Sequence, residues 1–323
     1  MFALIQFTSW YWIGFIVCVV LALALDLGVF HRQAHTVKLR EALAWSGVWF
    51  CLAMLFALGI YALGRKTGDG GRESLEFLTG YLIELSLSMD NVFVIALIFA
   101  YFHVPAMFQH RVLFWGILGA LVMRGFMILA GVALIDRVHW VLWLCGALLV
   151  YSGIKTLFVE SEIEPEKSRV VRLARKLYPV TPHFDSHKFT TRWNGRTALT
   201  PLALVLLLVE TSDLIFAVDS IPAVFAVTTK PFIVFTSNVF AILGLRSLYF
   251  VLAGAISSFR FLKYGLSLVL LFIGIKMLLD PHDRPPLFWF QVEIPISISL
   301  VVVLGIILSS ILLSILIPKR ARP

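Results

Sequence analysis

The sequence predicts an all-α, polytopic membrane protein with about nine transmembrane helices and an inverted repeat of three-helix units. The chain of 323 residues is 60% hydrophobic and only 14% charged, far from the composition of a soluble domain. Apolar segments of about 20 residues, long enough to cross about 30 Å of hydrocarbon, recur along its whole length. Pairs of similar stretches also recur at a nearly constant offset.

The predicted spans form a single transmembrane domain over residues 1–323. Two spans precede the first repeat, residues 75–158, and one follows the second repeat, residues 199–280. A cytoplasmic loop, residues 159–198, connects the two repeats. In order, the nine spans are residues 10–30, 42–64, 75–101, 111–134, 138–158, 199–226, 231–254, 262–280 and 292–317.

Two pairs of segments define the repeat. MRGFMILAG (123–131) resembles LRSLYFVLAG (245–254), and GALLVYSGIK (146–155) resembles LSLVLLFIGIK (266–276). Each unit holds three spans, an odd number, so the second unit must cross the membrane in the opposite sense. Transporters built from such inverted repeats bind their substrates near the membrane midplane, between the repeats.

The basic residues predict the orientation of the chain. The net charge of +8 favours a membrane-orienting role over nucleic-acid binding, because most Lys and Arg fall in loops of one side if the N-terminus is outside. We therefore expect a multi-pass protein of the cell inner (plasma) membrane with a cytoplasmic C-terminus. No Lys or Arg precedes the first apolar run, so we expect no cleavable signal peptide. The cysteines form no CxxC motif and read as core residues.

The loop at residues 159–198 is acidic at its start and basic afterwards. Its basic part carries an apolar stripe at helical spacing, which predicts a helix on the inner membrane surface. A regulatory or docking role stays open, although a helix that connects the two halves is the simpler interpretation. The residues of the stripe are Val170, Val171, Ala174, Leu177 and Tyr178.

The first span of the first repeat, residues 75–101, carries ionisable residues at membrane depth. Such groups are costly in a span and usually mark an ion or substrate path. Glu84, Ser88 and Asn91 follow one another at i, i+4 and i+7 and share a helix face. Asp90 lies about 120° around the helix from Glu84.

The first span of the second repeat, residues 199–226, repeats this pattern. Glu210 and Asp213 are three residues apart and adjacent on the helix surface. Asp219 would point away from Glu210 on an unbroken helix, but Ser220 and Pro222 follow it. Proline removes a backbone donor and clashes with the preceding turn. We therefore expect a break or kink at residues 218–222 that swings Asp219 inward and frees a carbonyl oxygen.

The five acids exceed the two arginines within the spans, Arg124 and Arg246. We interpret these arginines as structural counter-ions rather than as ligands. The alternative to a transport role of the acids is that they form fixed salt bridges with Arg124 or Arg246. Three unbalanced acids would leave protons or a metal cation to supply the missing charge. Carboxylate, amide and hydroxyl oxygens suit Mn²⁺, Mg²⁺ or Ca²⁺. Asn238 is either an auxiliary ligand or an interhelical hydrogen-bonding group.

At these residues the sequence resembles the TerC family of integral membrane proteins, and most closely its Alx-like manganese-export branch. The matching stretches are FLTGYLIELSLSMDNVFV, VLLLVETSDLIFAVDSIPAVFAVT, FTSNVFAILGLRSLYFVLAG and GIKML. The resemblance implies membership of the LysE transporter superfamily, with Mn²⁺ efflux along the acidic membrane residues. The family name also refers to tellurium resistance, but an oxyanion such as tellurite fits an acid-rich site badly.

The leading hypothesis is a secondary transporter that exports Mn²⁺, with Ca²⁺ as the alternative ion and protons as the coupling ion. We expect no enzyme activity and no tightly bound cofactor. The chain has no GxxxxGK[ST] motif for an ATP motor. A membrane partner that supports metal loading or insertion of exported proteins is the second hypothesis. An intramembrane aspartyl protease using Asp90 and Asp213 is disfavoured, because the GxGD signature is absent.

Overall fold

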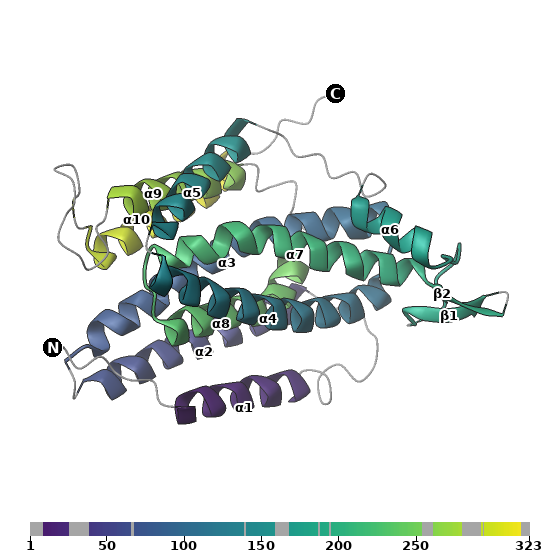
Figure 1. The fold of residues 1–323 in the computed structure, drawn as a ribbon, viewed down its shortest axis with the longest axis horizontal. Coiled ribbons are helices and arrows are strands. Elements are labelled where there is room, and N and C mark those ends of the chain that lie inside the picture. The colour runs from purple at the N-terminus through teal and green to yellow at the C-terminus, as the bar shows by residue number, and fades with distance from the viewer. Residues whose placement is uncertain are drawn as a thin grey trace.

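The computed structural model has the predicted all-α, polytopic architecture (Figure 1). It describes residues 9–25, 39–65, 68–138, 140–158, 168–186, 188–193, 195–253, 261–279, 292 and 294–317. Within these residues, eight helices are long and apolar enough to cross a membrane. A further apolar helix, α1 (Ser9–Leu25), is shorter, and the rest of the first predicted span lies outside the described residues.

Proline marks the beginning of several helices. Pro201 and Pro231 are the first residues of α7 and α8, while Pro105 and Pro295 immediately precede α4 and α10. Proline suits these positions because its fixed φ is helical and its missing N–H would have no intrahelical acceptor. The eight long helices are α2 (Leu39–Gly64), α3 (Gly70–Tyr101), α4 (Ala106–Arg137), α5 (Val141–Phe158), α7 (Pro201–Phe225), α8 (Pro231–Ala253), α9 (Leu262–Leu279) and α10 (Ile296–Leu316).

Helices α3 and α8 form the centre of the bundle and pack against each other. In α8, 83% of the most apolar window is buried inside the protein, against 17% in α2 and 22% in α10. The outer helices instead expose large apolar side chains, such as Phe126 of α4 and Val301 of α10. An apolar surface of this kind on a polytopic chain is the surface that contacts lipid. Lipid contact therefore falls mainly on the outer helices.

Helices α5 and α9 pack closely through glycines and lie beside α10 at one edge of the bundle (Figure 1). A Cβ added at Gly153 would lie 3.0 Å from the carbonyl oxygen of Ser267. One added at Gly274 would lie 2.9 Å from the carbonyl oxygen of Gly146. Small residues that let two backbones approach in this way are a common basis of helix association in membranes.

The loop between the repeats is more structured than its sequence suggested. It contains the helix α6 (Arg169–Leu177) and an antiparallel hairpin of β1 (Thr190–Trp193) and β2 (Arg196–Leu199), both at one end of the bundle (Figure 1). The hairpin was missed, although Gly195, which has φ of +77°, follows an asparagine, a frequent hairpin-turn pair. In α6, Val171 and Ala174 are buried in an apolar cluster with residues of α7, whereas Leu177 and Tyr178 are exposed.

The predicted break at residues 218–222 is wrong, because α7 continues through Pro222 to Phe225. Proline removes only the hydrogen bond to the carbonyl of Val218, and it lies within one turn of the end of the helix. The next turn is intact, since the backbone N–H of Ala226 donates to the carbonyl of Pro222 at 3.1 Å. The side chain of Asp219 therefore keeps the direction that an unbroken helix gives it.

Candidate functional site

Six polar residues from four helices meet in the middle of the bundle, and each is at most 8% exposed. Asp213 lies 12 residues from either end of α7, which is about 18 Å at a rise of about 1.5 Å per residue. The group therefore lies near the centre of the membrane-spanning region. These residues, called the Arg124 cluster below, are Glu84 and Asn91 of α3, Arg124 of α4, Asp213 and Ser220 of α7, and Asn238 of α8.

The guanidinium group of Arg124 holds the cluster together. Its Nε and Nη2 donate to both carboxylate oxygens of Asp213, at 3.1 and 2.9 Å. Its Nη1 contacts Oε1 of Glu84 and also donates to Ser220 Oγ at 3.2 Å and to Asn238 Oδ1 at 3.0 Å. The planar fork of an arginine matches a carboxylate with two parallel hydrogen bonds. One cation thus joins three other helices to α4.

Asn91 completes the cluster and borders a small cavity. Its Nδ2 donates to Asp213 Oδ1 at 3.1 Å. The adjoining cavity has a volume of about 20 Å³, enough for about one water molecule. Its polar lining comes from Asn91, Ser212 and Asp213, and its other walls include Gly116, Ala120 and Leu245.

Two acceptors in the cluster have no hydrogen-bond partner. Among the described residues, Oε2 of Glu84 and Oδ1 of Asn91 are buried without a donor. A buried polar atom left in this state costs about 1–3 kcal/mol. The charges are also unequal, since Glu84 and Asp213 carry two negative charges and Arg124 one positive charge. A cluster with a net charge of −1, in which Asn91 has a free oxygen atom and lines a water-sized cavity, is suited to a cation.

Glu210 lies next to this cluster, one turn before Asp213 on α7. Its carboxylate fits against Gly119 of α4, where any added Cβ would overlap the carboxylate oxygens. The charges of Glu210 and Asp213 repel each other. The side chain of Glu210 is half-buried, which leaves it between the cluster and the surroundings of the bundle.

Two of the predicted metal-site acids, Asp90 and Asp219, lie apart from the Arg124 cluster. Asp219 accepts a hydrogen bond from Ser152 of α5 at 2.8 Å, on a different side of α7 from Asp213. Asp90 faces away from Glu84 and interacts electrostatically with Lys263 of α9. Ser88 is buried on the Glu84 face of α3.

Arg246 is buried on α8, and it supplies none of the hydrogen bonds that define the Arg124 cluster. Within the described residues, no three His, Cys, Asp or Glu side chains are arranged to hold a metal ion. A cation beside Asp213 would therefore be bound by two carboxylates, the Asn91 amide and water, a set in which Mg²⁺-like ions commonly retain several waters.

A second buried acidic group was missed from the sequence. Glu73 and Glu76 of α3 are 0% and 2% exposed and pair with Lys230. The third predicted span begins at residue 75, and the predicted spans leave out residues 227–230, so Glu73 and Lys230 fall outside them. The spacing of Glu73, Glu76 and Glu84 at i, i+3 and i+11 places all three on one face of α3 and was the available signal.

Comparisons with known proteins agree on one family. Residues 70–322 match the family model described as the integral membrane protein TerC family. A protein of Myxococcus xanthus, named "Uncharacterized membrane protein STKORF319", is 52% identical over 314 residues, which cover 96% of this chain and 93% of that protein. The "Putative membrane-bound redox modulator Alx" of Escherichia coli (strain K12) is 47% identical, and the aligned residues cover 94% of this chain and 93% of that protein. An "Uncharacterized membrane protein" of Rickettsia felis is 37% identical, and the aligned residues cover 94% of this chain and 97% of that protein. No solved structure matches the chain significantly.

Proposed function

This chain belongs to the TerC family of integral membrane proteins, and from the Arg124 cluster we propose that it is a transporter of divalent metal cations, with Mn²⁺ as its substrate. The observation that carries the proposal is the pair of buried oxygen atoms without donors at Glu84 and Asn91, in a cluster whose Asn91 and Asp213 line a water-sized cavity. Hard oxygen donors favour Mn²⁺, Mg²⁺ and Ca²⁺ over softer metals. Mn²⁺ also follows from the resemblance of the acidic spans to the manganese-export branch of the family.

Arg124 has the role of an internal cation in this proposal. Its guanidinium group pairs with both Glu84 and Asp213 while the site holds no metal ion, and it balances one of their two negative charges. An arriving divalent cation competes with Arg124 for these carboxylates, because both need the same oxygen atoms. The pair of carboxylates then alternates between the arginine, the metal ion and protons. Such alternation at no stage leaves the two buried acids without any positive partner, which limits the cost of their burial in the low-dielectric interior.

The contacts between the two predicted repeats support transport by alternating access. Asn91 and Asp213 are 122 residues apart, close to the offset of the sequence repeat, and they hydrogen-bond to each other. Residues at matching positions beside a two-fold axis would make this contact. An offset of about 121 residues likewise exchanges the Gly153–Ser267 contact with the Gly274–Gly146 contact. An inverted repeat of this kind, as in the LysE superfamily, would expose the site to each side in turn.

The proposed direction is export from the cytoplasm across the inner membrane. The distribution of Lys and Arg favours an outside N-terminus and a cytoplasmic C-terminus. In that orientation α6 and the hairpin face the cytoplasm. Protons that enter from outside would displace the metal ion from Asp213 and so drive its export. This proposal does not explain the tellurium resistance to which the family name refers.

A matched pair of substitutions on one helix tests the proposal. Asp213→Asn removes a carboxylate of the cluster, whereas Asp219→Asn removes one that lies six residues away and contacts Ser152 instead. In proteoliposomes with a Mn²⁺-sensitive dye and an imposed pH gradient, Asp213→Asn should abolish flux and Asp219→Asn should retain most of it. Equal flux in Asp213→Asn and the unaltered protein would disprove the assignment.

A docking function is the second proposal, and α6 is the observation that favours it. Leu173 and Leu177 are 57% and 65% exposed on a strongly basic helix. A membrane partner involved in metal loading or insertion of exported proteins would bind there. Deletion of α6 separates the two functions, since a transporter should retain flux and a docking protein should lose its activity.

The name of the E. coli relative suggests redox modulation, which would require an electron carrier. The three cysteines of this chain lie on three separate helices, α1, α2 and α5, and are free thiols. A thiol couple within one chain is therefore the least supported of these functions. The residues are Cys18, Cys51 and Cys145.

A further inference from the structure

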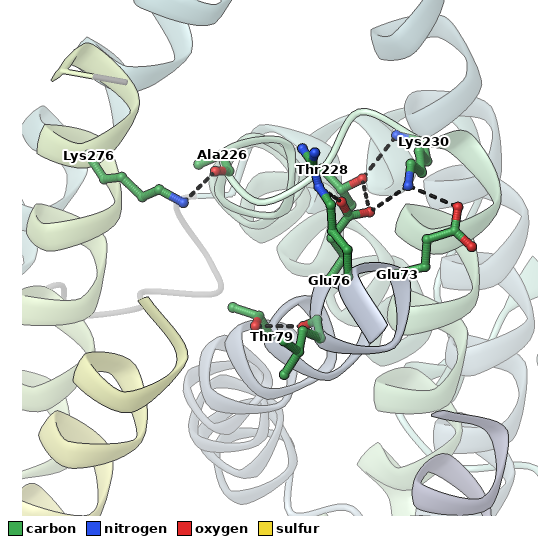
Figure 2. Close-up of polar contacts among 9 residues, drawn as sticks. Glu73, Glu76, Thr79, Ala226, Thr228, Lys230 and Lys276 are labelled. Carbon is green, nitrogen blue, oxygen red and sulfur yellow. Dashed lines mark hydrogen bonds and ion pairs between the residues drawn. The ribbon is translucent and has the colours of Figure 1, made fainter. Parts of the chain in front are cut away.

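A second charged group lies at the end of the bundle where α3 begins and α7 connects to α8 (Figure 2). Glu73 and Glu76 point from α3 toward this connection, and the ammonium group of Lys230 lies between them, 2.9 Å from Glu73 Oε1 and 3.4 Å from Glu76 Oε2. Thr228 Oγ1 donates to Glu76 Oε2 at 2.8 Å. On the outer side, Arg72 Nε donates to Glu76 Oε1 at 3.1 Å.

Lys230 does not satisfy all the acceptors of this group. Glu73 is fully buried, and its Oε2 has no hydrogen-bond partner among the described residues. The ammonium binds only the other oxygen of that carboxylate. A divalent cation can bind both oxygens of one carboxylate together with oxygens of a second carboxylate and a hydroxyl group. The unpartnered oxygen of Glu73 is therefore available to a divalent cation that takes the place of the ammonium group.

The same face of α3 connects this group to the Arg124 cluster. Glu73, Glu76, Gly80 and Glu84 follow one another at helical spacing, and all are buried. Glu76 and Glu84 are eight residues apart, or about 12 Å along the helix axis. Between them Gly80 packs tightly, since an added Cβ would lie 3.0 Å from Ser237 Oγ of α8. The Arg124 cluster and the group around Lys230 are therefore two separate acidic sites on one face of α3.

The backbone around Lys230 is held from two sides. Lys276 of α9, 3% exposed, donates to the carbonyl of Ala226 at 3.3 Å, just after the end of α7 (Figure 2). The N–H of Lys230 donates to Thr228 Oγ1 at 3.3 Å. The side chain of Lys230 is 22% exposed, so it has a direct route to solvent. The backbone between α7 and α8 is therefore held in place, whereas the ammonium group of Lys230 can move from the carboxylates into solvent.

We propose that Glu73, Glu76 and Thr228 form a second binding site for a divalent cation, and that Lys230 fills it as a tethered competitor which the cation displaces. The inference deepens the proposed function, because it rests on a divalent cation passing along α3 from the Arg124 cluster. Return of the ammonium group to the carboxylates would then expel the cation, which makes this site the exit. Arg124 at the central site and Lys230 at this second site then have the same role, that of a side-chain cation which the metal ion displaces.

The number and affinity of bound Mn²⁺ ions in the purified full-length protein test the proposal, with electron paramagnetic resonance to measure free Mn²⁺. The experiment uses the Asp213→Asn background, in which the central site is removed. There, Lys230→Gln should raise Mn²⁺ affinity about tenfold or more, because a competing positive charge at this distance is lost. Adding Glu73→Gln should remove the gain. Lys188→Gln, which breaks a surface pair with Asp185, is the matched control and should change nothing.

The wild-type protein provides a second measurement that needs no substitution. Rising Mn²⁺ should increase the labelling of Lys230 by an amine-reactive reagent, read by mass spectrometry, and leave that of Lys188 unchanged. An affinity unchanged by Lys230→Gln, or labelling of Lys230 that does not respond to Mn²⁺, overturns the second site. If instead Asp213→Asn alone leaves Mn²⁺ binding intact while Lys230 still responds, the central site fails and the second site stands.

Discussion

Of the substitutions in the Arg124 cluster, Arg124→Met should lower the stability of the protein most. It removes every hydrogen bond that Arg124 donates to α3, α7 and α8 and leaves Glu84 and Asp213 as buried carboxylates without a counter-ion. Removing one partner of a buried ion pair costs about 3–5 kcal/mol. An exposed charge such as Arg137, at the end of the same helix, should cost no more than about 0.5 kcal/mol.

The assay is unfolding of the purified full-length protein in detergent, with Arg137→Met as the matched control. A double-mutant cycle with Asp213→Asn should show that the two losses are not additive, because the second substitution removes one of the stranded charges. Mn²⁺ adds a further test. If the ion takes the place of the guanidinium group, saturation at 100 times Kd should restore about 2.7 kcal/mol to Arg124→Met.

The result that refutes this reasoning is an Arg124→Met protein as stable as the Arg137→Met control. That outcome would mean that Glu84 and Asp213 do not depend on Arg124 as their counter-ion. Stability that is lost but does not respond to Mn²⁺ would preserve the structural role of Arg124 and refute its competition with the metal ion.

Three other predictions follow from the packing. Gly119→Ala should reduce Mn²⁺ flux in proteoliposomes, because the added Cβ displaces the carboxylate of Glu210, whereas Gly47→Ala on α2, with open space around it, should retain full flux. Gly274→Val should lower stability by about 1–3 kcal/mol, measured by unfolding in detergent, because it separates α5 from α9; an effect equal to that of Gly47→Ala would contradict the close contact. Leu173→Asp should increase amide hydrogen exchange across α6 in lipid nanodiscs, since we expect this exposed side chain to contact lipid; unchanged exchange would show that the helix lies in water.

Local signals in the sequence were sufficient for most of the fold. The apolar segments predicted the helices, because the length of an apolar run depends on neighbouring residues alone. The prolines at the starts of α4 and α10 are a further local signal, and the spans predicted over residues 111–134 and 292–317 did not use it. The face shared by Glu84, Ser88 and Asn91 was also correct, because helical periodicity fixes it. The hairpin was overlooked, although its Asn-Gly turn was readable.

The composition of the site was not available from local signals. Helical geometry places Asp213 and Asp219 on different sides of α7 but does not say which side meets α4, so the inward turn expected of Asp219 was wrong. The pairing of Glu73 with Lys230 joins residues 157 positions apart. Only the packing of α3 against α7 and α8 brings them together.

The sequence by itself determined that this chain is a multi-pass membrane protein of the TerC family with more acids than arginines in its spans. The tertiary structure decided which acids share a counter-ion, because a hydrogen-bonded ion pair forms only when its nitrogen and oxygen atoms lie within about 4 Å of each other. Distances on that scale depend on the positions and rotations of whole helices, which no single segment encodes.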